Sequence, residues 1–189
     1  MKRCIVIDEI RKIKELDLSR NPNLDFARDM FIFSFCTRGM SFIDMAYLKK
    51  TDLSNGCLSY RRKKTGQLLT MEWTGQMQDI FDKYRYVGTS YLLPIISRED
   101  GSERRQYQSQ MRKINRHLKD IARLIGLSLT LSLYYTRHSW ATIARGKDVP
   151  LSGISEGLGH DSETTTQIYL DSIKPSKVDK ANRMILEDL

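Results

Sequence analysis

Three residues in the C-terminal part of the chain, Arg137, His160 and Tyr169, are of types that can perform chemistry on a phosphate. His160 follows Arg137 by 23 residues, and Tyr169 follows His160 by 9 residues. A tyrosine hydroxyl can act as a nucleophile, and guanidinium and imidazole groups can stabilise the charge that develops on phosphorus. A phenol with a pKa of about 10 is a poor nucleophile unless neighbouring groups stabilise its anion. The pattern therefore predicts that the two basic side chains converge on Tyr169.

Each of these residues also has an ordinary structural interpretation. Tyr169 fits a half-buried tyrosine of the core, and His160, which follows Gly159, fits a histidine bound to the carbonyls at a helix end. Arg137 lies in an otherwise apolar segment, where a buried guanidinium needs an anion. That anion could be a carboxylate of this chain or a phosphate of a ligand.

A second group of basic residues, Arg61, Arg62, Lys63 and Lys64, lies at the tip of a predicted β-hairpin. A lysine on a mobile hairpin can protonate a leaving oxygen, which makes Lys64 a candidate general acid. The three residues before it would then contact a nucleic-acid backbone. The alternative for Lys64 is a solvated turn lysine in a run of like charges.

Two residues at the junction of two apolar segments complete the candidates. Arg38 precedes Gly39, and an arginine is favoured at a helix C-terminus by the helix dipole. Ser41 to Asp44 has the form of a capping box, which by itself explains both polar residues.

The composition favours a polyanionic partner. The 189 residues contain 31 Lys and Arg against 23 Asp and Glu, which gives a net charge of +8 and a pI near 9.4. DNA or RNA is the ordinary partner of such a chain. Cys4, Cys36 and Cys57 lack zinc-site spacing and fit reduced thiols, so no metal site is expected. No apolar run is long enough for a membrane span and no signal peptide is present, which predicts a cytoplasmic protein that is not bound to a membrane.

The apolar periodicity predicts a mainly α fold with one small antiparallel β-sheet (α+β) in a single domain. A turn is expected at 21–23, a hairpin over 56–71, an extended run over 91–96 and a loop over 98–105. Helices are expected over 8–16, 24–36, 41–49, 74–86, 106–125, 133–145 and 150–158, then from a Ser162 cap to Leu170, and finally over 175–189.

Taken in order, these residues resemble the catalytic domain of the tyrosine recombinases (phage integrase family), over about Leu24 to Leu170. The Leu158-Gly159-His160 element with Tyr169 carries most of the resemblance. The segments 38–46 (RGMSFIDMA) and 135–142 (YTRHSWAT) are similar to integrases of mobile elements in Bacteroides-type bacteria.

The resemblance implies a role for each of these residues. Tyr169 would attack the scissile phosphodiester, giving a 3′-phosphotyrosyl bond and a free 5′-hydroxyl, and a partner strand's 5′-hydroxyl would reverse the attack. Arg137 would clamp the non-bridging oxygens, His160 would hydrogen-bond the same phosphate, and Lys64 would be the general acid. The covalent bond conserves the phosphodiester's energy, so the family uses neither ATP nor a metal ion.

The chain departs from the family pattern at two positions. Ser41 stands where the family has an arginine, three residues before an acidic residue, and Arg38 is the expected substitute. Tyr134 stands where the family has His or Lys, three residues before Arg137. A tyrosine hydroxyl can bond to a phosphate but is a poor base near neutral pH.

The resemblance also bears on partners. The family's N-terminal core-binding domain does not fit before Leu24, so we expect residues 1–189 to be the catalytic domain alone, with weak and salt-sensitive binding to double-stranded DNA. The tail from Pro175 to Leu189 would pack on its own domain or dock on a neighbouring protomer of a tetramer on DNA. The rival functions are a DNA-binding module that has lost catalysis and a type IB topoisomerase-like enzyme.

Overall fold

The computed structural model describes residues 5–86, 88–173 and 186. Its order of elements is α1 (Ile7–Glu15), α2 (Pro22–Cys36), α3 (Phe42–Tyr47), the 3-10 helix η1 (Lys50–Asp52), β1 (Leu53–Ser54), β2 (Cys57–Arg61), β3 (Leu68–Glu72), α4 (Gly75–Tyr84), α5 (Glu103–Leu124), α6 (Tyr134–Gly146), α7 (Leu151–Leu158) and α8 (Glu163–Ile173). The strands form one antiparallel sheet in the order β1-β2-β3. The predicted mainly α fold with a small antiparallel sheet is confirmed.

The structure corrects several predicted boundaries. Asn21 is the N-cap of α2 rather than part of a separate turn: its side chain accepts a hydrogen bond from the Leu24 N–H at 3.2 Å, and Pro22 is the first helical residue. The predicted loop over 98–105 ends early, because α5 begins at Glu103. The helix predicted over 41–49 ends at Tyr47, and 91–96 contributes only a bridge between Tyr91 and Lys49.

Strand β1 was not predicted, because two residues are too few to show an alternating pattern. Its register is fixed by pairing with β2, where Leu53 lies opposite Leu58. The helix predicted over 175–189 lies outside the described residues. The predicted Ser162 cap is confirmed, since its hydroxyl accepts from the Thr165 N–H at 3.2 Å, and α8 continues to Ile173.

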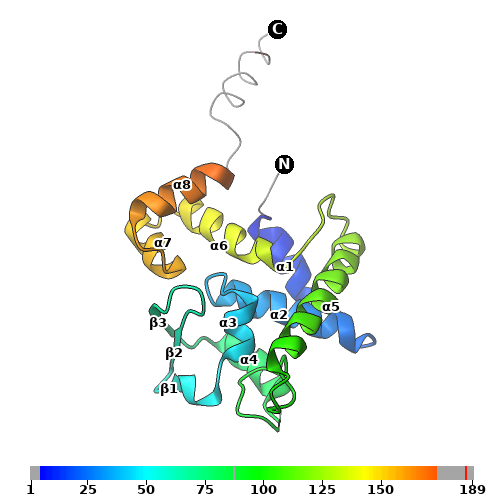
Figure 1. The fold of residues 1–189 in the computed structure, drawn as a ribbon. Helices are drawn as coiled ribbons and strands as arrows, with labels where there is room; N and C mark the ends of the chain where they lie inside the picture. Colours follow the sequence, from blue (N-terminus) through cyan, green and yellow to red (C-terminus); the bar gives the residue numbers. More distant parts are fainter. Residues whose placement is uncertain (1–4, 87, 174–185, 187–189) are drawn as a thin grey trace.

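Helix α2 is the centre of the main core. Figure 1 shows it among α1, α3, α5 and α6, and it contacts α1, α4, α5 and α6 directly. Its Met30, Phe31 and Phe33 are fully buried. From Met30 onward the helix is apolar nearly all round, which is the pattern of a helix that packs on several sides.

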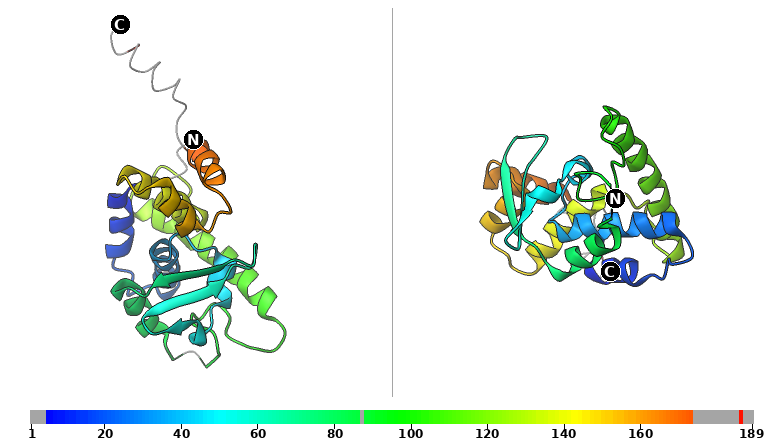
Figure 2. Two further views of the ribbon diagram at one scale, coloured as in Figure 1. Left: turned by 90° about the vertical axis from the view of Figure 1, so that its left-hand side faces the viewer. Right: turned by 90° about the horizontal axis from the view of Figure 1, so that it is seen from below.

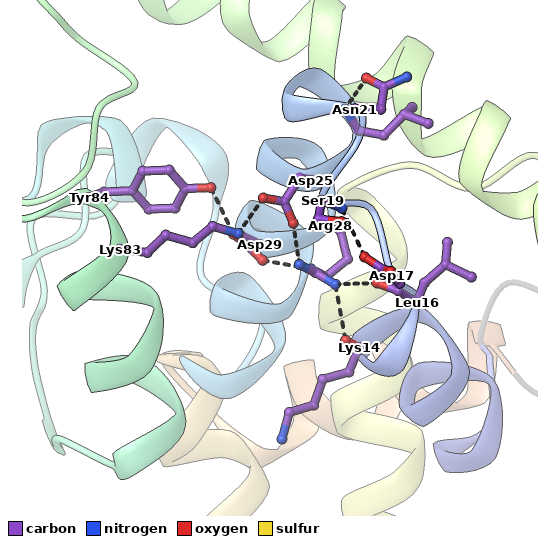
Figure 3. Close-up of polar contacts among 11 residues, drawn as sticks. Lys14, Leu16, Asp17, Ser19, Asn21, Asp25, Arg28, Asp29, Lys83 and Tyr84 are labelled. Carbon is purple, nitrogen blue, oxygen red and sulfur yellow. Dashed lines mark hydrogen bonds and ion pairs between the residues drawn. The ribbon is translucent and has the colours of Figure 1, made fainter.

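A charged network joins α2 to α4 and to the end of α1 (Figure 3). Asp29 accepts hydrogen bonds from Arg28 Nε at 2.6 Å and from Lys83 Nζ and Tyr84 Oη at 2.7 Å each. Asp25 also pairs with Arg28 and Lys83. Arg28 Nη1 donates to the carbonyl of Leu16 at 2.8 Å. Each buried charge is thus paired, which is the condition under which charges are tolerated at low exposure.

A second, smaller core lies between α6, α7 and α8. It consists of Ala141, Ala144, Ile154, Leu158 and Leu170. The large core instead contains residues of all the helices from α1 through α5, of the sheet and of the segment before α6. In Figure 1 and in the turned views of Figure 2, α7 and α8 lie together at one end of α6, on the opposite side from α5. Helix α6 therefore connects the two cores.

Candidate active site

Arg137 is placed by a close contact between α6 and the turn after α2. Gly39 has a φ of +73°, and a Cβ there would lie 2.3 Å from the Arg137 Cα, so only glycine permits this approach. A hydrogen bond between α6 and α2 helps to fix how the two helices lie against each other, because the buried Thr136 hydroxyl lies 2.7 Å from the Ser34 hydroxyl. The sequence predicted that residues 38 and 39 interrupt the helices, and the structure confirms it with φ values of +61° and +73°.

The Arg137 guanidinium is held by carbonyl oxygens. Nη1 donates to Gly39 O at 3.4 Å, and Nη2 donates to Leu158 O. Within the described ranges, no carboxylate forms a salt bridge with it. Burial, followed by the positive charge of Arg62, lowers the pKa of Arg137 from its ordinary value. A buried cation held by neutral oxygens favours an anion such as a phosphate in front of it.

His160 is placed by the end of α7. Gly159 adopts the left-handed conformation of a helix C-cap, with φ +61°, as the sequence predicted. The backbone N–H of His160 then donates to Ser155 O at 3.0 Å. Its ring nitrogen Nδ1 lies 2.8 Å from Thr166 Oγ1 on α8, not at a carbonyl of the helix end.

The charge state of His160 follows from its surroundings. Burial first, and then the charges of Arg137 and Arg62, lower the pKa of His160 to about 4. The imidazole is therefore neutral at neutral pH and carries a single ring proton. It can donate one hydrogen bond to a phosphate oxygen without first losing or gaining a proton.

Tyr169 lies in a stack of aromatic rings. His138 is parallel to it with ring centroids 5.0 Å apart, and His160 meets it edge-on at 5.5 Å. Tyr134 meets His138 edge-on, with ring centroids 4.3 Å apart. The Tyr169 hydroxyl is buried and makes no hydrogen bond within the part of the chain that the structure describes. Burial raises the pKa of Tyr169 well above its ordinary value, and the charge of Arg137 opposes that rise.

The basic side chains of the hairpin, Arg62, Lys63 and Lys64, lie in different surroundings. Arg62 Nη1 donates to Gly159 O at 2.6 Å, beside His160. The Lys63 backbone N–H donates to Asp44 Oδ1 at 2.7 Å, and the Lys63 ammonium lies 4.7 Å from the centre of the Tyr47 ring, so Lys63 contacts α3. Lys64 is exposed between β2 and β3, and its charge is among those that lower the pKa of His160.

Three further candidates lie around this centre. Arg61 is exposed and donates to Gly66 O at 3.1 Å on the hairpin. Ser41 caps α3: its hydroxyl accepts from the Asp44 N–H at 3.4 Å and lies 2.6 Å from Asp44 Oδ2. Arg38 is half-buried, and its Cδ would lie 3.4 Å from a Cβ on Gly157. Within the described residues Arg38 forms no salt bridge.

The structure thus gathers Arg137, His160, Tyr169 and Arg62 at one place, with Lys64 at its edge. The position of Arg62 was missed, since four consecutive basic residues do not reveal which one turns inward. Thr166 was also missed as a partner of His160; it is fully buried, and only its place one helical turn before Tyr169 could have indicated it. Within the described residues, no cluster of His, Cys, Asp or Glu could hold a metal ion, and no helix could span a membrane.

Solved structures share this fold. The chain matches a lambda integrase dimer bound to a COC′ core site with a TM-score of 0.66 and 20% identity, covering 92% of this chain and 49% of the other. It matches the XerA recombinase with a TM-score of 0.64 and 17% identity, covering 97% and 64%. A Tn1549 transposon integrase in complex with transposon right end DNA matches with a TM-score of 0.57 and 15% identity, covering 94% and 66%. The chain thus spans between half and two thirds of these proteins. No curated protein matches the sequence.

The sequence itself shows the family. The model of the phage integrase family matches residues 43–175, well over half of the chain, and this range contains Arg137, His160 and Tyr169. The matched fold agrees with the one that the resemblance predicted. On its sequence and its fold, the chain belongs to the phage integrase family, the tyrosine recombinases.

Proposed function

We propose that the chain is the catalytic domain of a site-specific DNA recombinase that integrates or excises a mobile element. One observation carries the proposal: the buried Tyr169 hydroxyl, without a hydrogen-bond partner among the described residues, lies in the same site as Arg137 and His160. A buried hydroxyl without a partner is costly, and such groups are retained where they act on a ligand. The net charge of +8 suits double-stranded DNA as that ligand.

In the proposed reaction, the Tyr169 oxygen attacks the scissile phosphorus, and its hydroxyl proton passes to solvent water. The bond from phosphorus to the 5′-oxygen breaks, and that oxygen takes a proton from Lys64. The products are a 3′-phosphotyrosyl bond and a free 5′-hydroxyl. Attack by the 5′-hydroxyl of a partner strand then rejoins the DNA and releases Tyr169, so no energy source is consumed. Arg137 clamps the non-bridging oxygens, and the neutral His160 donates a hydrogen bond to one of them.

Two arginines are candidates for the second guanidinium, which the family has at the position that Ser41 occupies here. Arg38 is the substitute expected from the sequence. Arg62 has the stronger structural support, because it bonds to the carbonyl beside His160 and its charge lowers the pKa of both Arg137 and His160. We therefore propose that Arg62 is the second clamp and that Arg38 is a nearby supporting charge. Arg61 and Lys63 are proposed as contacts to the DNA backbone.

The partners proposed are DNA and further copies of the chain. Matching structures include a lambda integrase tetramer bound to a Holliday junction, and we propose a tetramer on DNA for this chain too. The tail over 175–189 is proposed as the segment that joins protomers. A cytoplasmic, nucleoid-associated location follows from the proposed substrate.

The experiment is capture of the covalent intermediate. The protein is incubated at low salt with a library of nicked duplexes of randomised core sequence, in which loss of a short 5′-fragment prevents religation. Adducts that survive denaturation are then sequenced. The proposal predicts adducts with a shared site, and their absence from Tyr169→Phe.

The same assay separates the rival functions. Specific DNA binding without any adduct would favour a binding module that has lost catalysis. Adducts without a shared site, together with relaxation of any supercoiled plasmid, would favour a type IB topoisomerase-like enzyme.

A further inference from the structure

The hydrogen bond between His160 and Thr166 joins residues that lie on two different elements of the site. His160 follows α7, whereas Thr166 lies on α8, one turn before Tyr169. Thr166 is fully buried, while its neighbours Thr164 and Thr165 are exposed. A bond of 2.8 Å from Thr166 Oγ1 to His160 Nδ1 therefore ties the imidazole to the helix that carries the nucleophile.

The direction of this bond follows from the distances. The Thr166 hydroxyl has one proton and two acceptors within reach: His160 Nδ1 at 2.8 Å and Ser162 O at 3.4 Å. Hydroxyl donors prefer acceptors at about 2.7–2.8 Å. The Ser162 carbonyl also already accepts the Thr166 N–H at 3.3 Å. The distances therefore favour donation of the hydroxyl proton to Nδ1, with that nitrogen as the acceptor.

The tautomer of the ring is then determined. A neutral imidazole with Nδ1 as acceptor carries its proton on Nε2, because the hydrogen bond at one nitrogen selects the state of the other. An Nε2–H is a donor, the group that a phosphate oxygen needs. The opposite tautomer would present a lone pair to the phosphate and repel it.

We propose that Thr166 is a positioning residue for His160. Its hydroxyl holds the imidazole as the Nε2–H tautomer and aims it at the phosphate only when α8 is seated with Tyr169 in the site. The role of the phosphate rests on the proposed function, whereas the tautomer can be measured without DNA.

The first test is nuclear magnetic resonance of the protein with ¹⁵N-labelled histidine. The chain has only three histidines, His117, His138 and His160, so His160→Gln assigns the third signal. At pH 7 we expect the Nε2–H pattern for His160, retained in Thr166→Ser and lost to a mixture of tautomers in Thr166→Val. An Nδ1–H pattern in the unmodified protein, or an unchanged pattern in Thr166→Val, would overturn the proposal.

The second test is the rate of adduct formation on a captured duplex. Thr166→Val keeps the shape of the side chain, and we expect a loss of about tenfold or more, on the scale of losing a group that orients a reacting residue. Thr166→Ser restores the hydroxyl, and we expect a rate within about threefold of the unmodified protein. Equal losses in both variants would indicate a packing role and overturn the proposal. If the unmodified protein forms no adduct, the recombinase proposal fails, and the resonance pattern alone decides the role of Thr166.

Discussion

The two cores of the molecule differ in how firmly they hold the residues that meet in the site. The large core joins α1 to α5, the sheet and the segment before α6, and it is reinforced by the charged network around Asp29. The small core holds α7 and α8 against α6 with five buried side chains among the residues that the structure describes. Arg62 follows β2, which packs in the large core, whereas His160 follows α7 and Tyr169 lies on α8, the helices of the small core. Tyr169 is thus carried by the less extensively packed part of the molecule.

This difference suggests how the site is controlled. Elements with few buried contacts open at lower free energy than the core does. The Tyr169 hydroxyl is buried in the structure, so the attack on DNA proposed above would require a local rearrangement around α8. A small core would permit that rearrangement without unfolding the large core.

The largest expected effect is that of Tyr169→Phe, which removes the only oxygen proposed to attack. No covalent adduct should form, while Tyr134→Phe, which changes a neighbouring and exposed tyrosine, should still form one. Denaturing electrophoresis of the captured duplex measures both. Adducts in Tyr169→Phe would show that another residue is the nucleophile.

Arg137→Ala should follow, because the guanidinium is the cation at the junction of the two cores. Loss of one donor to a developing oxyanion lowers rates by about 10²–10³-fold. Single-turnover cleavage measures the effect, and the melting temperature serves as the control for folding. A rate within threefold of the unmodified protein, which is about 0.7 kcal/mol, would exclude Arg137 from the clamp.

Arg62→Ala and Arg38→Ala decide which part of the molecule supplies the second cation. If Arg62 is the clamp, its substitution should cost on the order of 10²-fold in single-turnover cleavage and that of Arg38 much less. Arg61→Ala, which removes an exposed charge from the same hairpin, is the matched control. The reverse order of effects would assign the role to Arg38.

Stability should distinguish the cores directly. Ile154→Ala and Leu118→Ala each delete fully buried atoms, from the small and the large core respectively. Each should cost about 2–5 kcal/mol. Hydrogen exchange should show the loss in α7 and α8 alone for Ile154→Ala, but throughout the chain for Leu118→Ala. Faster exchange in α2 on Ile154→Ala would mean that the two cores unfold as one.

The smallest effect concerns pH. The pKa of His160 is lowered to about 4 from its ordinary 6.5, so between these values the unfolded chain binds the proton more readily. The folded state should therefore lose stability as the pH falls from about 6.5 to about 4, and His160→Gln should lose less over the same range. Urea unfolding at several pH values measures this. Parallel curves for the two proteins would show that His160 is not shielded in the folded state.

Much of the fold and the main residues of the candidate site could be predicted from the sequence. The spacing of apolar residues predicted the helices from α1 to α8, and the alternation around Arg61 predicted the hairpin. Arg137, His160 and Tyr169 were recognisable by type and order, and the range that the family model matches contains all three. Such signals are local, because helix and strand periods, caps and glycine turns depend on neighbours within a few residues.

Only the tertiary structure decided how these residues face one another. Which of four adjacent basic residues turns inward depends on the carbonyl of Gly159, 97 residues away from Arg62. That Arg137 is held by carbonyls, and that Thr166 bonds His160, depends on how α6, α7 and α8 pack. The sequence by itself determined the types and the order of the site residues. The charge state, the burial and the orientation of their side chains arise from long-range contacts, which produce no periodic pattern in the sequence.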